Sequence, residues 1–288
     1  RATNNAIIDA PFTPNNNSII FGASAGSDFM PFLLTANVFS GTGSVTYGSH
    51  SGDTGIVRAD VRHTYTGNTT LAFGTTYVDS TKELASTGGP LGNKLLTAAA
   101  TLLMTGGTLS YLGGNVDYSG RFSTAGSQQW QINATDATFS SVTFATALVG
   151  ASSLRLLGGL LTLSSASSTF SGGVTLTSGT LYAGAAQSGV SGPLGITGTI
   201  TFTPANTGVL AYTSASSSFD YSSRFATTSG QFRRIDLNGQ DVTFSTPMGG
   251  DNAFVLAQGV GGSGVLTLAV ANTYTQGTTL SDGTLKCG

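Results

Sequence analysis

The sequence contains few charged residues. Only 8% of its 288 residues are Asp, Glu, Lys or Arg, against roughly 25% in ordinary soluble domains. The net charge is −2, and Arg233-Arg234 is the only adjacent pair among the 11 basic residues. Because nucleic-acid binding needs clustered Lys and Arg, this distribution argues against a nucleic-acid partner.

Cysteine and long apolar runs are also scarce. The single cysteine, Cys287, excludes an internal disulfide and a cysteine-based metal site. We interpret it as an incidental residue; the alternative is a covalent link between two chains. No run of 18 apolar residues is present, which predicts that no helix spans a membrane. His50 and His63 lack metal-ligand spacing, so we expect neither a metal nor a cofactor.

Glycine, serine, threonine and β-branched residues dominate what remains. There are 41 Gly, and Ser and Thr take the polar role usually held by charged residues. Such residues suit strands and tight turns. The 39% of residues that are hydrophobic alternate with polar ones, which excludes a disordered polymer and predicts an all-β fold.

The chain is built from a long internal repeat. Three aromatic corners, Tyr65, Phe170 and Tyr274, stand about 105 residues apart within similar strings of short strands and turns. The repeat divides the chain into an atypical N-terminal cap or docking segment, two full units and the start of a third. These are residues 1–53, 54–158, 159–263 and 264–288.

Other markers recur in the same order after each corner. A Gly-Pro-Leu-Gly turn comes first, an Asp-Tyr-Ser block with a following Arg-Phe comes next, and a Val-Thr-Phe strand comes last. The two turns are 89–92 and 192–195, the two blocks run from Asp117 to Arg121 and from Asp220 to Arg224, and the strands are 142–144 and 242–244. The third copy stops at Gly288, before its Gly-Pro-Leu-Gly turn, which we interpret as a sign of a larger parent protein.

The repeat predicts a parallel β-helix. If each turn of the helix takes about 20 to 25 residues, one repeat holds four or five turns. We expect Val, Leu, Ile and Phe to face inward and Thr and Ser to face outward. The segment Lys94–Met104 has helix-forming residues, but it aligns with the strand-like Thr197–Thr203. We therefore predict a strand there.

Three segments resemble a known bacterial repeat. The Leu-Thr-Leu, Asn-Thr-Tyr-Thr, Gly-Thr-Thr-Leu, Asp-Gly-Thr-Leu series at Leu266–Leu285 resembles the autotransporter-associated β-strand repeat. Leu161–Leu181 and, more loosely, Val57–Tyr77 do so as well, and together they cover about a quarter of the chain. The resemblance implies a right-handed parallel β-helix exported to the bacterial surface, and it implies little about activity.

The candidate chemical residues favour structural roles. Asp117 with Arg121, and Asp220 with Arg224, are copies of one position, so we expect each Arg to bond a carboxylate or carbonyl of a neighbouring turn. The alternation of Arg58, Asp60 and Arg62, with His63 beside them, predicts a solvated strand face or, alternatively, a small anion-binding or interface patch. Gly259–Gly264 matches a dinucleotide glycine pattern but lacks its helix and acidic residue, so we expect a flexible turn.

The sequence therefore favours a non-enzymatic structural protein. We expect a self-associating β-solenoid subunit of an extracellular bacterial filament or layer, with residues 1–53 docking onto a neighbouring copy. The first alternative is an adhesin stalk that binds glycans or surfaces. The second is a polysaccharide-active enzyme, which needs a pair of carboxyl groups that no single repeat supplies.

Overall fold

A computed structural model shows an all-β chain. It describes residues 19–21, 32–34, 39–48, 55–84, 88–93, 101–135, 141–204, 207–257, 259, 262 and 264–288. The chain forms two compact units, residues 1–140 and 141–288. No α-helix occurs among the described residues. Three 3-10 turns do, and they are η1 (Ser80–Lys82), η2 (Ser119–Arg121) and η3 (Ser222–Arg224).

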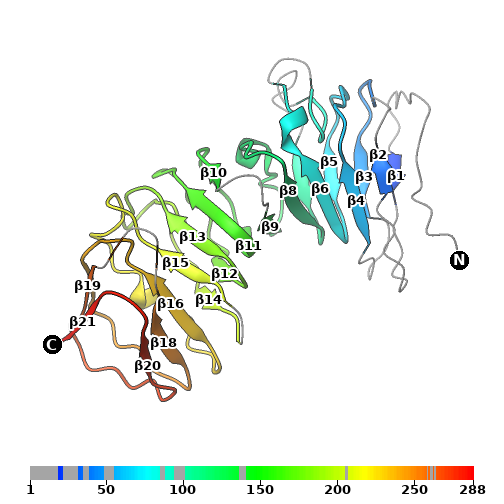
Figure 1. The fold of residues 1–288 in the computed structure, drawn as a ribbon. Coiled ribbons are helices and arrows are strands. Elements are labelled where there is room, and N and C mark those ends of the chain that lie inside the picture. Colours follow the sequence, from blue (N-terminus) through cyan, green and yellow to red (C-terminus); the bar gives the residue numbers. More distant parts are fainter. Residues whose placement is uncertain are drawn as a thin grey trace, which may run out of the picture. The chain divides into compact units, whose positions relative to one another are not determined.

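The first unit contains two parallel sheets, and from β1 to β8 the chain passes alternately through one and the other (Figure 1). One sheet consists of β1 (Ile19–Phe21), β3 (Val45–Tyr47), β5 (Thr69–Leu71) and β7 (Leu102–Met104), in that order. The other consists of β2 (Phe32–Leu34), β4 (Ile56–Ala59), β6 (Thr75–Asp79), β8 (Thr108–Leu112) and β9 (Gln129–Ala134).

The second unit is also built from parallel ladders, and its long strand β11 (Ser153–Leu163) takes part in two of them. The first half of β11 pairs with β12 (Val174–Leu176), which pairs with β14 (Ile200–Phe202). The second half pairs with β10 (Val142–Phe144) and begins a ladder through β13 (Thr180–Ala183), β15 (Val209–Ala211), β16 (Phe232–Asp236), β18 (Ala253–Leu256) and β20 (Thr278–Leu280). A third ladder joins β17 (Val242–Phe244), β19 (Val265–Leu268) and β21 (Thr284–Cys287).

Inward and outward positions alternate along these strands as the sequence predicts. In β10, Val142 and Phe144 are buried and Thr143 is half-buried. The same pattern of buried first and third residues recurs in β12 and β14. Each fully buried aliphatic or aromatic side chain contributes roughly 1.5 to 3 kcal/mol, so the stacked inward rows supply much of the stability.

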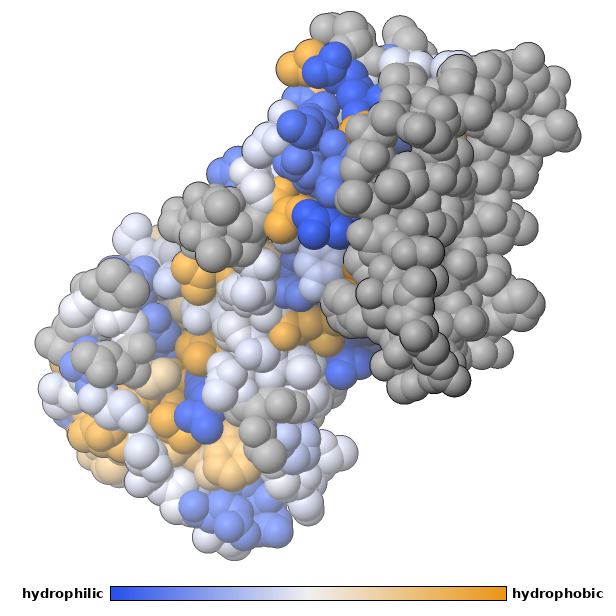
Figure 2. All heavy atoms as spheres, turned by 45° about the vertical axis from the view of Figure 1, so that its right-hand side comes forward, coloured by the Kyte–Doolittle hydropathy of each residue, from blue (hydrophilic) through white to orange (hydrophobic). Residues whose placement is uncertain are grey.

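The outward residues are mostly small and weakly polar. Figure 2 shows pale atoms over most of the coloured surface on the face in view, with blue and orange in smaller separate areas. This matches a chain in which Thr, Ser and Gly occupy the outward and turn positions. The parallel pairing of successive passages of the chain is consistent with a β-helix or β-solenoid.

Several predicted elements are confirmed. The Val-Thr-Phe segments form β10 and β17, and the predicted strand at Thr197–Thr203 contains β14. Within Lys94–Met104, Leu102–Met104 is strand β7, whereas residues 94–100 lie outside the described residues. Most of the N-terminal segment 1–53 also lies outside them. Hydrogen bonds between successive passages join residues 19 to 33 positions apart, a wider range than predicted.

In the part of the chain that the structure describes, no helix has the length and apolar character needed to cross a membrane.

Candidate functional site

The first two aromatic corners lie in the core, and each is covered by a Gly-Pro-Leu-Gly turn. Tyr65 and Phe170 are both 0% exposed. The Tyr65 carbonyl accepts a hydrogen bond from the Asn93 N–H at 2.9 Å, and the Phe170 carbonyl accepts one from the Ile196 N–H at 3.2 Å. Both donors directly follow a Gly-Pro-Leu-Gly turn, so the corner and the turn form one packing unit.

Glycine and leucine fit these turns to the corners. Leu91 and Leu194 are fully buried. Gly92 and Gly195 have φ angles of 83° and 69°, and a Cβ atom on either would fall against the aromatic ring or carbonyl of the corner. The last glycine of each turn is therefore required both by backbone conformation and by close approach.

The third corner is different, because Tyr274 is only half-buried. Its neighbour Thr273 donates to the Met248 carbonyl at 2.9 Å, as Thr169 donates to the Leu148 carbonyl at 2.8 Å. The corner thus attaches to the preceding passage of the chain in the usual way. Among the described residues, however, no N–H donates to the carbonyl of Tyr274.

At two of the three corners, the tyrosine hydroxyl pairs with a threonine hydroxyl of the following strand. The hydroxyls of Tyr65 and Thr69 lie 2.7 Å apart, and those of Tyr274 and Thr278 lie 2.6 Å apart. Thr69 donates its own proton to the Leu91 carbonyl, so Tyr65 is the donor of its pair. Burial raises the pKa of Tyr65 to about 12, which keeps the phenol protonated. At the middle corner Phe170 has no hydroxyl, and the following strand begins with Val174.

The repeated aspartates hold local turns. Asp117 Oδ1 accepts hydrogen bonds from the Ser119 N–H at 2.8 Å and from its hydroxyl at 2.5 Å. Asp220 Oδ1 accepts from the Ser222 N–H at 2.8 Å, and its Oδ2 accepts from the N–H and hydroxyl of Ser245, both at 2.7 Å.

The repeated arginines reach polar groups of earlier passages of the chain. Arg224 donates to four backbone carbonyls, and two of these belong to the Gly-Pro-Leu-Gly turn: Leu194 at 2.7 Å and Gly195 at 3.2 Å. The other two are Gly198 and Thr197. Arg121 is buried and its Nη2 lies 3.4 Å from the Thr69 hydroxyl. The bonds of Arg224 are those that the sequence predicts.

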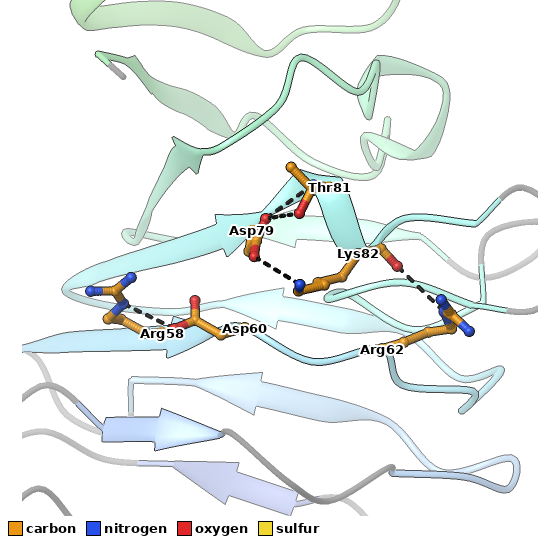
Figure 3. A network of polar contacts seen from close by, with 6 residues as sticks. All are labelled: Arg58, Asp60, Arg62, Asp79, Thr81 and Lys82. Atoms are coloured by element: carbon orange, nitrogen blue, oxygen red, sulfur yellow. Dashed lines mark hydrogen bonds and ion pairs between the residues drawn. The ribbon is translucent and has the colours of Figure 1, made fainter. Parts of the chain in front are cut away.

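The charged face of the first unit is an internally paired network (Figure 3). Arg58 Nε lies 3.2 Å from Asp60 Oδ2, and Lys82 Nζ lies 3.8 Å from Asp79 Oδ2. Arg62 donates to the Lys82 carbonyl at 3.5 Å. Partial burial raises the pKa of Asp60, and the adjacent Arg58 opposes that shift. The Arg62 bond joins the segment after β4 to η1 of the next passage, which favours a structural role.

His63, next to this network in sequence, points into the core. It is fully buried, and its ring stacks on Phe39 with a centroid distance of 4.5 Å. Its Nδ1 accepts a hydrogen bond from the Phe39 N–H at 3.2 Å, so the neutral ring carries its proton on Nε2. Burial lowers the pKa of His63 to about 4. The sequence prediction that His63 lies beside a solvated face missed this inward orientation.

The sequence analysis did not predict two further polar residues that bind buried tyrosines. Glu83 Oε2 accepts a hydrogen bond from the Tyr118 hydroxyl at 2.9 Å, and Gln187 Oε1 accepts one from the Tyr221 hydroxyl at 3.4 Å. Both tyrosines belong to the Asp-Tyr-Ser blocks. Each acceptor precedes a Gly-Pro-Leu-Gly turn by several residues, and this shared position is the only signal in the sequence that links them.

A buried arginine occupies the core of the second unit. Arg233 is 1% exposed, and its Nη2 donates to the carbonyls of Ala226 and Gly249, both at 3.0 Å. Its Nε and Nη1 are buried without a hydrogen-bond partner among the described residues. Burial lowers the pKa of Arg233, and the nearby Tyr274 phenol opposes that shift. The sequence, which shows an Arg-Arg pair, does not reveal that one of the two faces inward.

A hollow of about 330 Å³ opens beside the third corner. Tyr274, Leu268, Asn272 and Cys287 line it. Cys287 is exposed and forms no disulfide, and it lies opposite Leu268 in the β19–β21 register.

A second, smaller hollow brings together two carboxyl groups, those of Asp236 and Asp282. Burial raises the pKa of Asp236, and the Asp282 charge adds to that shift. Within the described ranges, no group of three or more His, Cys, Asp or Glu residues is placed to hold a metal ion. The glycine pattern at Gly259–Gly264 borders this hollow, but Val260, Gly261 and Ser263 lie outside the described residues.

Comparison with known proteins finds no matching family model, no matching curated protein and no matching solved structure.

Proposed function

We propose that the protein is a non-enzymatic structural protein of a bacterial surface. In this proposal it is a right-handed parallel β-solenoid, built from a repeat of about 105 residues, that associates with itself in a filament or layer. The likeness of Leu266–Leu285 to the autotransporter-associated repeat supports the location. The network of hydrogen-bonded carboxylates and arginines supports a structural role for the charged residues.

The observation that carries the proposal is the backbone pairing of parallel passages, which leaves an edge at β20, a strand that pairs with β18 on one side and with no further strand among the described residues. Leu280 is 53% exposed, whereas Leu71 and Leu176, the last residues of β5 and β12, are fully buried. Val174 N–H, at the start of β12, donates to the Thr199 carbonyl of the next passage at 2.9 Å. Among the described residues, Thr278 N–H, at the start of β20, has no such acceptor.

An edge of this kind is a template for further strands. It presents unpaired N–H and C=O groups together with apolar side chains, and both are satisfied when another parallel passage is added. Contact between the tail of one copy and the head of the next is heterologous, so it produces open fibres rather than closed oligomers. In this arrangement the N-terminal segment 1–53 of the incoming copy docks on the edge.

The test is negative-stain electron microscopy of the purified protein over a concentration series. The proposal predicts fibres of uniform width whose length increases with protein concentration. Short isolated rods at every concentration would contradict it. That result would favour the adhesin alternative, and glycan binding would then be the next assay.

A further inference from the structure

Two carboxylates of the second unit, those of Asp236 and Asp282, line one hollow of about 10 Å³. We propose that this hollow binds a single calcium ion, held by the two carboxylates together with backbone oxygens. The site lies within one chain, so it requires neither self-association nor any other part of the proposed function. A calcium ion here would contradict our expectation from the sequence, which rested on the lack of metal-ligand spacing among histidines and cysteines.

Asp236 is a buried carboxylate without a neutralising partner. It is the last residue of β16 and is only 4% exposed. Its Oδ1 accepts the Asn238 N–H at 2.8 Å, whereas no group among the described residues donates a hydrogen bond to its Oδ2. In the same part of the chain, no Lys, Arg or His forms an ion pair with it. Because an unpaired buried charge is costly, this carboxylate is stabilised only by a cation or by a proton.

Asp282 adds a second negative charge at the same hollow. It is half-buried, and its Oδ1 accepts the Gly283 N–H at 2.7 Å. Burial raises the pKa of Asp236, and the charge of Asp282 raises it further. Two like charges at one hollow repel each other, and a divalent cation between them replaces that repulsion with attraction to both.

Neither carboxylate is needed for the turn in which it lies. In the preceding copy of the sequence repeat, Asn133 stands at the place of Asp236, and its Oδ1 accepts the Thr135 N–H at 3.0 Å in the same way. Ser178 stands at the place of Asp282 and likewise precedes a glycine with a positive φ. An uncharged side chain therefore supports each turn, which leaves the two negative charges at the hollow without a structural explanation.

The segment beside the hollow is longer than its counterpart and rich in glycine. Eight residues, 257–264, separate β18 from β19, whereas only three, 157–159, connect the two corresponding halves of the continuous strand β11. At Gly259, an added Cβ would lie 2.1 Å from both carboxylate oxygens of Asp236, so only glycine allows this approach of the backbone. Gly262, Gly264 and Gly283 line the hollow, and a glycine can offer only backbone groups to an ion.

These ligands favour calcium over other metals. Carboxylate and carbonyl oxygens are hard ligands, and no histidine or cysteine lines the hollow. Ca²⁺ accepts irregular sets of roughly six to eight oxygens, including waters and backbone carbonyls, whereas Mg²⁺ demands near-ideal octahedral geometry. The volume of about 10 Å³ is close to the minimum for one water molecule, so it admits a single ion. Because only two ligands are charged, we expect a dissociation constant of about 0.1 to 1 mM.

The test is titration of the full chain with calcium chloride alone, after removal of bound metal with EDTA and dialysis into metal-free buffer. Isothermal titration calorimetry should show one site per chain, and about 10 mM calcium should raise the unfolding temperature by several degrees. Magnesium chloride at the same concentration should raise it less.

The repeat supplies the substitutions for this test. Asp236→Asn and Asp282→Ser introduce the residues of the preceding copy, so each variant should fold, and each should bind calcium at least about tenfold more weakly. The matched control Asp251→Asn removes an exposed carboxylate of the second unit that does not line the hollow. Its calcium affinity should equal that of the wild-type protein.

The possible outcomes separate the calcium site from its alternatives. If calcium stabilises the wild-type protein and the two hollow variants equally, or if magnesium is as effective as calcium, the ion does not bind at this hollow and the site is overturned. If calcium has no effect and Asp236→Asn is more stable than the wild-type protein at pH 7, the two carboxyl groups share a proton instead, which also overturns it. Calcium-dependent stabilisation that both substitutions abolish supports the site, whether or not the chain forms fibres.

Discussion

At the residue scale, the core combines apolar stacking with a small number of buried polar groups. Tyr65 and Thr69 satisfy each other in one corner, and Phe170 with Val174 replaces that hydroxyl pair by an apolar pair in another. A buried polar group costs free energy unless it has a partner, so the two members of a pair must be exchanged together. Exchanging one pair for the other therefore tests whether the corners of the repeat are equivalent.

The corner pair predicts a coupled mutational effect. Phe170→Tyr alone buries a hydroxyl beside Val174 and should lower the free energy of unfolding by about 1 to 3 kcal/mol. Phe170→Tyr combined with Val174→Thr should recover about 1 kcal/mol, because the two hydroxyls can bond as Tyr65 and Thr69 do. A double-mutant cycle measured by urea unfolding gives the coupling energy, and purely additive effects would contradict the account.

His63 predicts a loss of stability in mild acid. Its pKa is lowered from 6.5 to about 4 in the folded protein, because it is buried and its Nδ1 already accepts the Phe39 N–H. Between these two values the unfolded chain binds a proton that the folded chain does not, so stability present above pH 6.5 is lost as the pH falls toward 4. The full loss amounts to about 3 kcal/mol.

The measurement for His63 is the free energy of unfolding at pH 7 and at pH 5, for the wild-type protein and for His63→Phe. The variant keeps the stacking on Phe39 and removes the titrating group, so it should lose less stability between the two pH values. Equal losses in the two proteins would assign the pH dependence to other groups.

At the element scale, the strands were predicted well because their signals are local. The alternation of buried and half-buried residues in β10, β12 and β14 follows directly from Val-Thr-Phe, Val-Thr-Leu and Ile-Thr-Phe. The inward orientation of His63 and Arg233 was not predictable in this way. Each lies beside charged residues in the sequence. The direction of Arg233 depends on the register of β16 with β18, about 20 residues away, whereas His63 lies outside the strands in an isolated bridge to Gly89.

The Gly-Pro-Leu-Gly turns recur in the sequence, and the structure shows what their residues contact. Leu194 fills the core, Gly195 permits the close approach to Phe170, and Arg224 bonds the carbonyls of both turn residues. The role of the arginine as a donor to carbonyls was among the sequence expectations. The role of the turn as a cover for the aromatic corner was not, because the two are separated by more than 20 residues of chain.

A glycine substitution tests this role. Gly195→Ala places a Cβ against the Phe170 carbonyl at a φ of 69°, and should lower the free energy of unfolding by about 2 to 4 kcal/mol. Gly230→Ala is the matched control, because Gly230 has a φ of 82° and its added Cβ would approach Pro204 no closer than 3.6 Å. Its cost should be about 1 kcal/mol. If thermal unfolding shows that both substitutions destabilise the protein equally, the close approach of Gly195 to Phe170 does not contribute to stability.

At the scale of the whole molecule, each unit is a stack of parallel strands with a continuous apolar interior. Among the described strands of the second unit, β20 and β21 have exposed residues at inward positions, namely Leu280 and Cys287. Because the chain has a single cysteine, a disulfide between two copies would join tail to tail. Such a link would block elongation instead of supporting a head-to-tail fibre, so assembly is best studied under reducing conditions.

The measurement that tests the central claim most directly is sedimentation velocity over a concentration series, comparing the wild-type protein with Leu280→Lys and Val190→Lys. Both substitutions add one positive charge at an exposed apolar residue, but only Leu280 lies on the open edge. The account predicts that the wild-type protein and Val190→Lys form large species as concentration rises, while Leu280→Lys stays monomeric, because an edge lysine opposes strand addition. Identical behaviour of all three proteins would contradict assembly through this edge.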